Sequence, residues 1–98
     1  MTKEVILKSL KSQKKELEEQ FGVEKLALFG SYSRDEATPQ SDIDILFALK
    51  KDAKLSIFKY LKLLSILESK LHHKVDLVRE EKIKPILKEY IHKDVIYV

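Results

Sequence analysis

Residues 25–48 read KLALFGSYSRDEATPQSDIDILFA, which is two apolar runs separated by a polar segment. The first run, 25–29, ends at a Gly-Ser pair and predicts a short buried strand. Residues 32–41 contain Thr-Pro-Gln-Ser, which is typical of a loop. The second run, 42–48, begins with alternating Asp and Ile and then becomes wholly apolar. It therefore predicts a strand that is half exposed at its start and buried at its end.

Three helices and two further strands are predicted on either side of this pair. Apolar residues at helical spacing predict helices over 3–20, 54–71 and 81–92. Short apolar runs predict strands over 74–78 and 94–98. The order is helix, strand, loop, strand, helix, strand, helix, strand. This order predicts an α+β fold with a small mixed four-stranded sheet and helices packed mainly on one face.

The ends and inner faces of these helices can also be read from the sequence. Thr2 is placed to cap the first helix, Gly22 to end it, and Pro85 to lie in the first turn of the third. Apolar side chains are expected to face the core from all three helices: Ile6, Leu10, Leu17 and Phe21, then Ile57, Leu61, Leu64, Leu67 and Leu71, then Ile83, Leu87, Tyr90 and Ile91.

The composition indicates one domain spanning residues 1–98, with 44% hydrophobic and 36% charged residues and no cysteine. No apolar run approaches the roughly 20 residues of a membrane span, and no signal segment precedes the first helix, so the cytoplasm is expected. The net charge of +3 is unevenly distributed: residues 31–48 hold four acids and one base, and residues 50–62 hold five lysines and one acid. The lysines form either a solvated helix face or a surface that attracts ATP or an acidic partner.

Paired aspartates at the start of the second strand are the first candidate site. Asp42 and Asp44 are two residues apart, so on a strand they point to the same side of the sheet. Like charges so placed are unfavourable unless a cation neutralises them, and an all-oxygen site suits magnesium or manganese. Asp76 lies inside an apolar strand and is a third candidate ligand.

The Gly-Ser pair at the end of the first strand is the second candidate site. Gly30 permits close approach of a bulky ligand, and Ser31 offers a hydroxyl and an amide to an anion. A phosphate cradle facing a metal site is what nucleotidyl or phosphoryl transfer requires. The alternative is a plain turn followed by surface aspartates.

This combination resembles the DNA-polymerase-beta-like nucleotidyltransferase superfamily, and over essentially its full length the chain resembles the minimal nucleotidyltransferase (MNT) family. The resemblance is carried by the Gly-Ser pair, ten further residues, Asp-Ile-Asp, and the aspartate of KVDLV. It implies that Gly30 and Ser31 hold the triphosphate of ATP. It also implies that Asp42 and Asp44 bind two Mg²⁺ ions, with Mn²⁺ as an alternative, and that Asp76 binds the catalytic metal and helps to activate the attacking hydroxyl.

Three residues of the loop extend this resemblance or depart from it. Arg34 matches the arginine of the family's GS-x-x-R-G segment, which implies a contact with phosphate. Ser41, the last residue of the loop, is also expected to bind the nucleotide. Asp35 stands where that segment usually has glycine, and it adds negative charge near the expected phosphate site.

The resemblance also implies a partner. Family members of this size are typically antitoxins that transfer AMP from ATP to a tyrosine of a HEPN-domain toxin, so a hetero-oligomer is expected. Two alternatives stay open: an antitoxin that neutralises its partner by binding alone, and a nucleotidyltransferase that acts on RNA or a small molecule. Nucleic acid is not expected, since the chain has no second domain to hold a strand. The short length also leaves few residues for an acceptor pocket, which favours a protein acceptor.

Two other features of the sequence have open interpretations. Tyr32 and Ser33 face substrate or lie in an exposed loop. The pair His72-His73 is more typical of a surface helix-to-strand junction than of a metal site.

Overall fold

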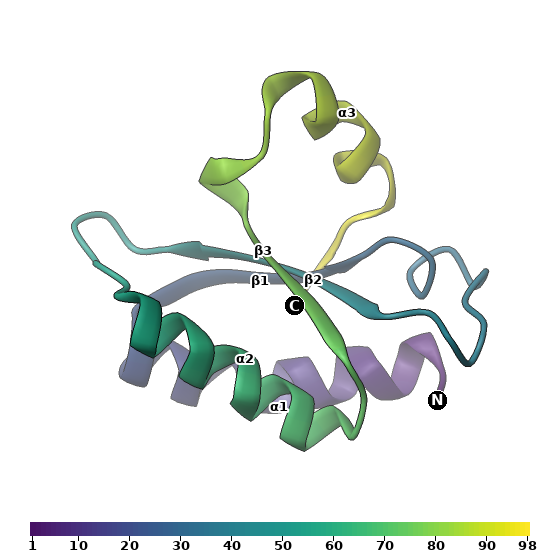
Figure 1. Ribbon diagram of the computed structural model, residues 1–98, viewed down its shortest axis with the longest axis horizontal. Helices are drawn as coiled ribbons and strands as arrows, with labels where there is room; N and C mark the ends of the chain where they lie inside the picture. Colours follow the sequence, from purple (N-terminus) through teal and green to yellow (C-terminus); the bar gives the residue numbers. More distant parts are fainter.

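The computed structural model describes residues 1–98 and shows a four-stranded sheet with helices on both faces (Figure 1). The predicted order of elements is confirmed, as is the α+β class. The elements are α1 (Lys3–Phe21), β1 (Val23–Phe29), β2 (Ile43–Leu49), α2 (Ile57–Leu71), β3 (Val75–Arg79), a 3₁₀ turn η1 (Glu80–Lys82), α3 (Pro85–Asp94) and β4 (Ile96–Tyr97). None of these helices is both long enough and apolar enough to cross a membrane.

The sheet is mixed, and its strand order is β3-β2-β1-β4. β1 pairs with β2 and with β4 in antiparallel fashion, and β2 pairs with β3 in parallel fashion. A parallel pair needs a crossover, and α2 supplies it between β2 and β3. This register sets Asp44 beside Asp76 across the parallel pair and Phe29 beside Asp44 across the antiparallel one.

The two faces of the sheet have different roles. α1 and α2 cover one face, and α3 stands on the other (Figure 1). The main core lies between the sheet and α1–α2, where Ile43, Ile45 and Phe47 of β2 are completely buried. A smaller cluster of Ala27, Leu46 and Ile83 lies on the α3 side. Alternate residues of β2 therefore serve opposite faces, as the pleat requires.

Local signals place the ends of the first two helices. The Thr2 hydroxyl accepts a hydrogen bond from the Val5 amide at 3.2 Å, and Gly22 ends α1 with φ +74°. The predicted caps of α1 are thus confirmed. Ser56 caps α2 by accepting from the Lys59 amide, so α2 begins at residue 57 rather than the predicted 54. His72 ends α2 with φ +51°, at the helix-to-strand junction expected for it.

The predicted inner face of α2 is wrong in its first half. The fully buried residues are Leu63, Leu67 and Leu71, whereas Ile57 and Leu61 are 64% and 52% exposed. Apolar residues occupy so many positions between 57 and 71 that helical spacing is compatible with more than one face. The face that packs is fixed by the sheet, and not by the helix sequence alone.

The start and packing of α3 also differ from the prediction. The expected helix over 81–92 divides into η1 and α3, with Ile83 and Lys84 extended between them. The residue before a proline disfavours helical geometry, so α3 begins at Pro85. No residue within α3 is buried, and Leu87 and Tyr90 are 48% and 69% exposed instead of facing the core.

Candidate active site

Two aspartates lie side by side on the sheet face that carries α3. Asp44 is the second residue of β2 and Asp76 the second of β3, and the parallel register pairs them directly. Their apolar neighbours point into the main core, so both carboxylates point to the opposite face. The structure thereby brings together two of the three predicted acidic residues.

The close approach of these carboxylates changes the acidity of Asp44. The pKa of the Asp44 carboxyl is raised to about 6, first by burial and then by the charge of Asp76, a hydrogen bond with Asp76 and the charge of Asp42. The Arg34 guanidinium acts in the opposite direction. A pair of carboxylates under this repulsion favours a bound cation.

Asp42 is the third predicted acidic residue of the site. It is exposed in the residue before β2 and acts on Asp44 through its charge. No three or more histidine or acidic side chains are arranged to hold a metal ion by themselves. The carboxylates of Asp44 and Asp76 nevertheless offer only oxygen ligands, which suit magnesium or manganese. Magnesium is commonly held by one or two carboxylates together with substrate phosphates.

Gly30 brings the turn after β1 directly against Asp44. Its φ is +78°, and a Cβ atom built there would lie 2.8 Å from Asp44 Cγ and 3.0 Å from Asp44 Cβ. Such distances are too short for a side chain, so the position requires glycine both for its backbone angle and for its space. The predicted Gly-Ser turn and the predicted aspartate therefore form one compact site.

The turn that follows Gly30 leaves amide groups free. The Gly30 carbonyl accepts from the Ser33 amide at 3.1 Å, the Arg34 amide at 3.2 Å and the Ser33 hydroxyl at 2.9 Å. The Ser31 and Tyr32 amides donate to no backbone carbonyl. These two N–H groups sit at the start of a tight turn, where they are available to an anion.

Arg34 ties the turn to the end of α3. Its Nε lies 3.0 Å from a Glu36 carboxylate oxygen, and its Nη1 lies 2.9 Å from one of Asp94. Hydrogen bonds to Asp94 and Glu36 raise the pKa of the guanidinium. The residue predicted to contact phosphate is thus held by two carboxylates, one of them 60 positions away.

Asp35 occupies a backbone conformation that suits glycine. Its φ is +59°, in the left-handed region, and its carboxylate lies 3.1 Å from Lys3 Nζ at the start of α1. Asp tolerates this region better than most residues. Asp35 therefore adopts the left-handed conformation that glycine favours.

The remaining residues of the loop are engaged within the fold. The Ser41 hydroxyl accepts from the Thr38 amide at 3.0 Å, so it stabilises the loop. Tyr32 and Ser33 are both buried, so of the two interpretations left open for them the exposed loop is excluded. The Tyr32 hydroxyl lies 3.3 Å from His73 Nε2, with the two rings edge to face at 5.8 Å.

A cavity beside the turn was not visible in the sequence. It has a volume of about 560 Å³ and opens between the start of α1 and the loop, with Lys3, Tyr32 and His73 among its lining residues. These residues come from three distant parts of the chain. Since no local pattern relates them, only the folded structure shows that they meet.

Comparison with known proteins agrees with this geometry. The family model described as Nucleotidyltransferase domain matches residues 10–98. Protein adenylyltransferase MntA of Thermococcus cleftensis is 39% identical over 98 residues, which is all of this chain and 97% of that protein.

Two solved structures share the fold. A protein assigned as a minimal nucleotidyltransferase has a TM-score of 0.78 and 29% identity, with 98% of this chain and 95% of that one covered. A toxin-antitoxin structure with AMP-PNP has a TM-score of 0.69 and 25% identity, with 99% and 72% covered.

Two substitutions at Asp35 test the backbone strain in the turn. Asp35→Gly and Asp35→Ala both remove the carboxylate and its ion pair with Lys3, so they differ only in the Cβ atom. Because φ is +59° here, the glycine variant should be more stable than the alanine variant by about 1 kcal/mol. Urea unfolding of the two variants measures this difference. Equal stability would show that the turn relaxes out of the left-handed region.

Substitution of Asp44 tests the repulsion between the carboxylates. Asp44→Asn should raise the free energy of unfolding at pH 8 by about 1–3 kcal/mol, because the folded state raises the pKa from 3.8 to about 6. The raised pKa means that the wild type loses stability as the pH rises from about 4 to above 6, so the advantage of the variant should shrink towards pH 4. Urea unfolding in EDTA at both pH values measures it.

The matched control for this experiment is Glu19→Gln, which neutralises an exposed acid on α1. It should show no such pH-dependent difference from the wild type. A less stable Asp44→Asn variant at pH 8 would contradict the predicted repulsion.

Proposed function

Because the chain belongs to the nucleotidyltransferase domain family, we propose that it transfers AMP from ATP to a hydroxyl, most simply a tyrosine, of a HEPN-domain toxin and thereby acts as its antitoxin. The observation that supports this most directly is the Asp44–Asp76 pair on the sheet face that carries α3, with the Gly30 turn packed against it. The relative named protein adenylyltransferase MntA and the toxin-antitoxin structure with AMP-PNP support the same class of reaction and partner.

The acidic residues would hold the metal. Asp44 and Asp76 would bind one Mg²⁺ ion, or Mn²⁺, and exposed Asp42 would complete a second position together with phosphate oxygens. Divalent ions there would neutralise the charge of the triphosphate and orient the attacking and leaving oxygens. This would also remove the repulsion that raises the pKa of Asp44.

The chain's own groups would bind the nucleotide and move the proton. The free amides of Ser31 and Tyr32 would hold phosphate oxygens. The acceptor oxygen would attack the α-phosphorus, the bond to the β-phosphate oxygen would break, and pyrophosphate would leave. Asp76 is the more exposed of the paired carboxylates, so it would accept the proton from the attacking hydroxyl.

Arg34 and Ser41 would contribute in different ways. Arg34 would exchange Asp94 for a phosphate oxygen, since its guanidinium already lies close enough to act on Asp44. Ser41 would position the loop before Asp42 by its bond with Thr38.

We also propose that the reaction takes place in the cytoplasm.

AMP transfer can be tested directly. The protein is incubated with ATP, magnesium and the helical protein encoded by the neighbouring gene, and the partner is examined by mass spectrometry. We expect a mass gain of one or more AMP groups and loss of toxin activity. Asp42→Asn combined with Asp44→Asn should slow transfer on the order of 10⁴-fold, as expected when groups that act as a unit are removed.

The matched control is Asp52→Asn, the same change at an exposed aspartate of the loop before α2. It should transfer AMP like the wild type. A double variant that still neutralises its partner fully would show that binding alone is sufficient. A wild-type protein that adds no AMP to the partner would overturn the proposed reaction.

Two glycines allow the cradle to be separated from general stability. Gly30→Ala and Gly22→Ala both place a Cβ at positive φ, and both should lower the free energy of unfolding by about 1–2 kcal/mol. Only the Gly30 variant displaces Asp44, so only it should weaken binding of a fluorescent ATP analogue in the presence of magnesium. Equal ATP-analogue affinity in the two variants would show that Gly30 has no role beyond stability.

A further inference from the structure

We propose that the exposed face of α3 is the docking site for the acceptor protein, and that this protein presents an apolar patch bordered by acidic side chains. The identification of the occupant as the acceptor rests on the proposed function. The location of the surface rests on exposure, charge and position in the fold.

An apolar stripe runs along α3 without a partner in the fold. Ile86, Leu87 and Tyr90 are 78%, 48% and 69% exposed, and their spacing places them on one side of the helix. α3 is attached to the sheet through partly buried Ile91 and through Ile83, which precedes it. The stripe is therefore not needed to hold α3, and exposed apolar side chains so grouped mark interaction surfaces.

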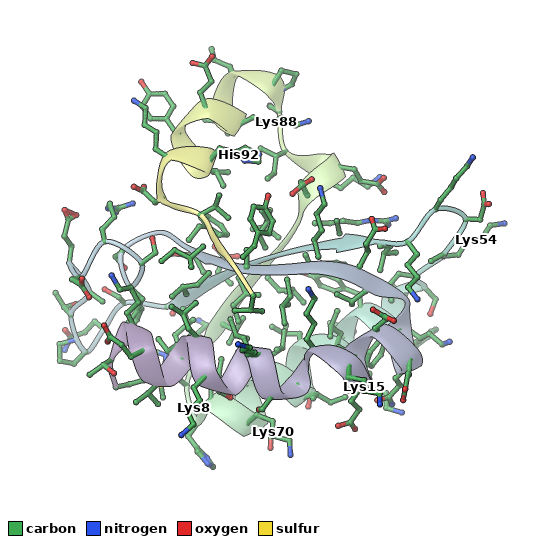
Figure 2. The ribbon with its side chains drawn as sticks, turned by 180° about the vertical axis from the view of Figure 1, so that it is seen from behind. Lys8, Lys15, Lys54, Lys70, Lys88 and His92 are labelled. Carbon is green, nitrogen blue, oxygen red and sulfur yellow. The ribbon has the colours of Figure 1, made fainter.

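The border of this stripe is basic. Residues 82–93 contain four lysines and His92 but only one acid, Glu89. None of these lysines, Lys82, Lys84, Lys88 and Lys93, forms an ion pair within the chain. Figure 2 labels Lys88 and His92 on α3, which stands clear of the other two helices. Unpaired positive charge around apolar side chains is complementary to an apolar patch with an acidic border.

The stripe lies on the same sheet face as the candidate active site. Leu46 and Val78 follow Asp44 and Asp76 by two residues, and they pack in the cluster beneath α3. The last residue of α3, Asp94, binds Arg34 of the Gly-Ser turn at 2.9 Å. A protein docked on α3 would therefore have its surface beside the carboxylate pair and the turn.

A second apolar patch offers a rival surface and a control. Ile57 and Phe58 on α2 are 64% and 82% exposed and also have lysines nearby. However, α2 covers the opposite face of the sheet (Figure 1). A partner bound there would be separated from Asp44 and Asp76 by the sheet itself.

The test compares matched double variants in binding to the helical protein encoded by the neighbouring gene. Leu87→Ser with Tyr90→Ser should raise the Kd for this protein at least tenfold, while leaving the affinity for a fluorescent ATP analogue unchanged. Ile57→Ser with Phe58→Ser should leave both values unchanged. Lys84→Glu with Lys88→Glu should also weaken binding, and added salt should weaken binding of the wild type.

Each outcome decides the proposal. Unchanged affinity of the α3 variants, loss of affinity only in the α2 variant, or tighter binding of the charge-reversed variant would overturn it. So would sedimentation showing a wild-type dimer that the Leu87/Tyr90 variant cannot form, because the occupant would then be a second copy. Binding that depends on α3 without any AMP transfer would leave the docking surface standing and overturn the proposed reaction. AMP transfer with unchanged binding would do the reverse.

Discussion

Two carboxylates held side by side on a parallel strand pair are the constraint on which the other features of the structure depend. Parallel pairing of β2 with β3 requires the α2 crossover, and the register sets Asp44 beside Asp76. The repulsion, together with burial, raises the pKa of Asp44, which is unfavourable for the isolated fold. Gly30 then becomes necessary, because any side chain there would occupy the space of the Asp44 carboxylate. Stability is thus reduced at the candidate active site, as is common at functional sites.

The main core lies on one face of the sheet, and the candidate active site lies on the other. Ile43, Ile45 and Phe47 of β2 and Val75 and Leu77 of β3 pack in the main core with α1 and α2 and are almost fully buried. On the other face, the starts of these strands carry the aspartates and their continuations, Leu46 and Val78, support α3. Since the pleat alternates side chains at every residue, a strand as short as β3 serves both purposes at once.

Features that depend on short sequence spacing were predicted well, and features that depend on distant contacts were not. Strand alternation places Asp42 and Asp44 on one side of the sheet, and Thr2 and Gly22 predict the caps of α1. The pairing of Asp44 with Asp76 comes instead from the parallel register of β2 and β3. The prediction of the inner face of α2 is partly wrong, because apolar residues occupy so many positions that spacing alone does not select one face. The prediction that Leu87 faces the core is wrong, because helical spacing shows that a face is apolar but not whether another element covers it.

Two ion pairs around the Gly-Ser turn could not be predicted from local sequence patterns either. They hold the loop in its conformation. Lys3 holds Asp35 from α1, and Asp94 holds Arg34 from α3. Each pair joins residues too far apart in the sequence for any local pattern to relate them. Exposed ion pairs contribute little stability individually, but here they fix the turn from both sides of the loop. The ends of two helices on opposite faces of the sheet thereby converge on the Gly-Ser turn.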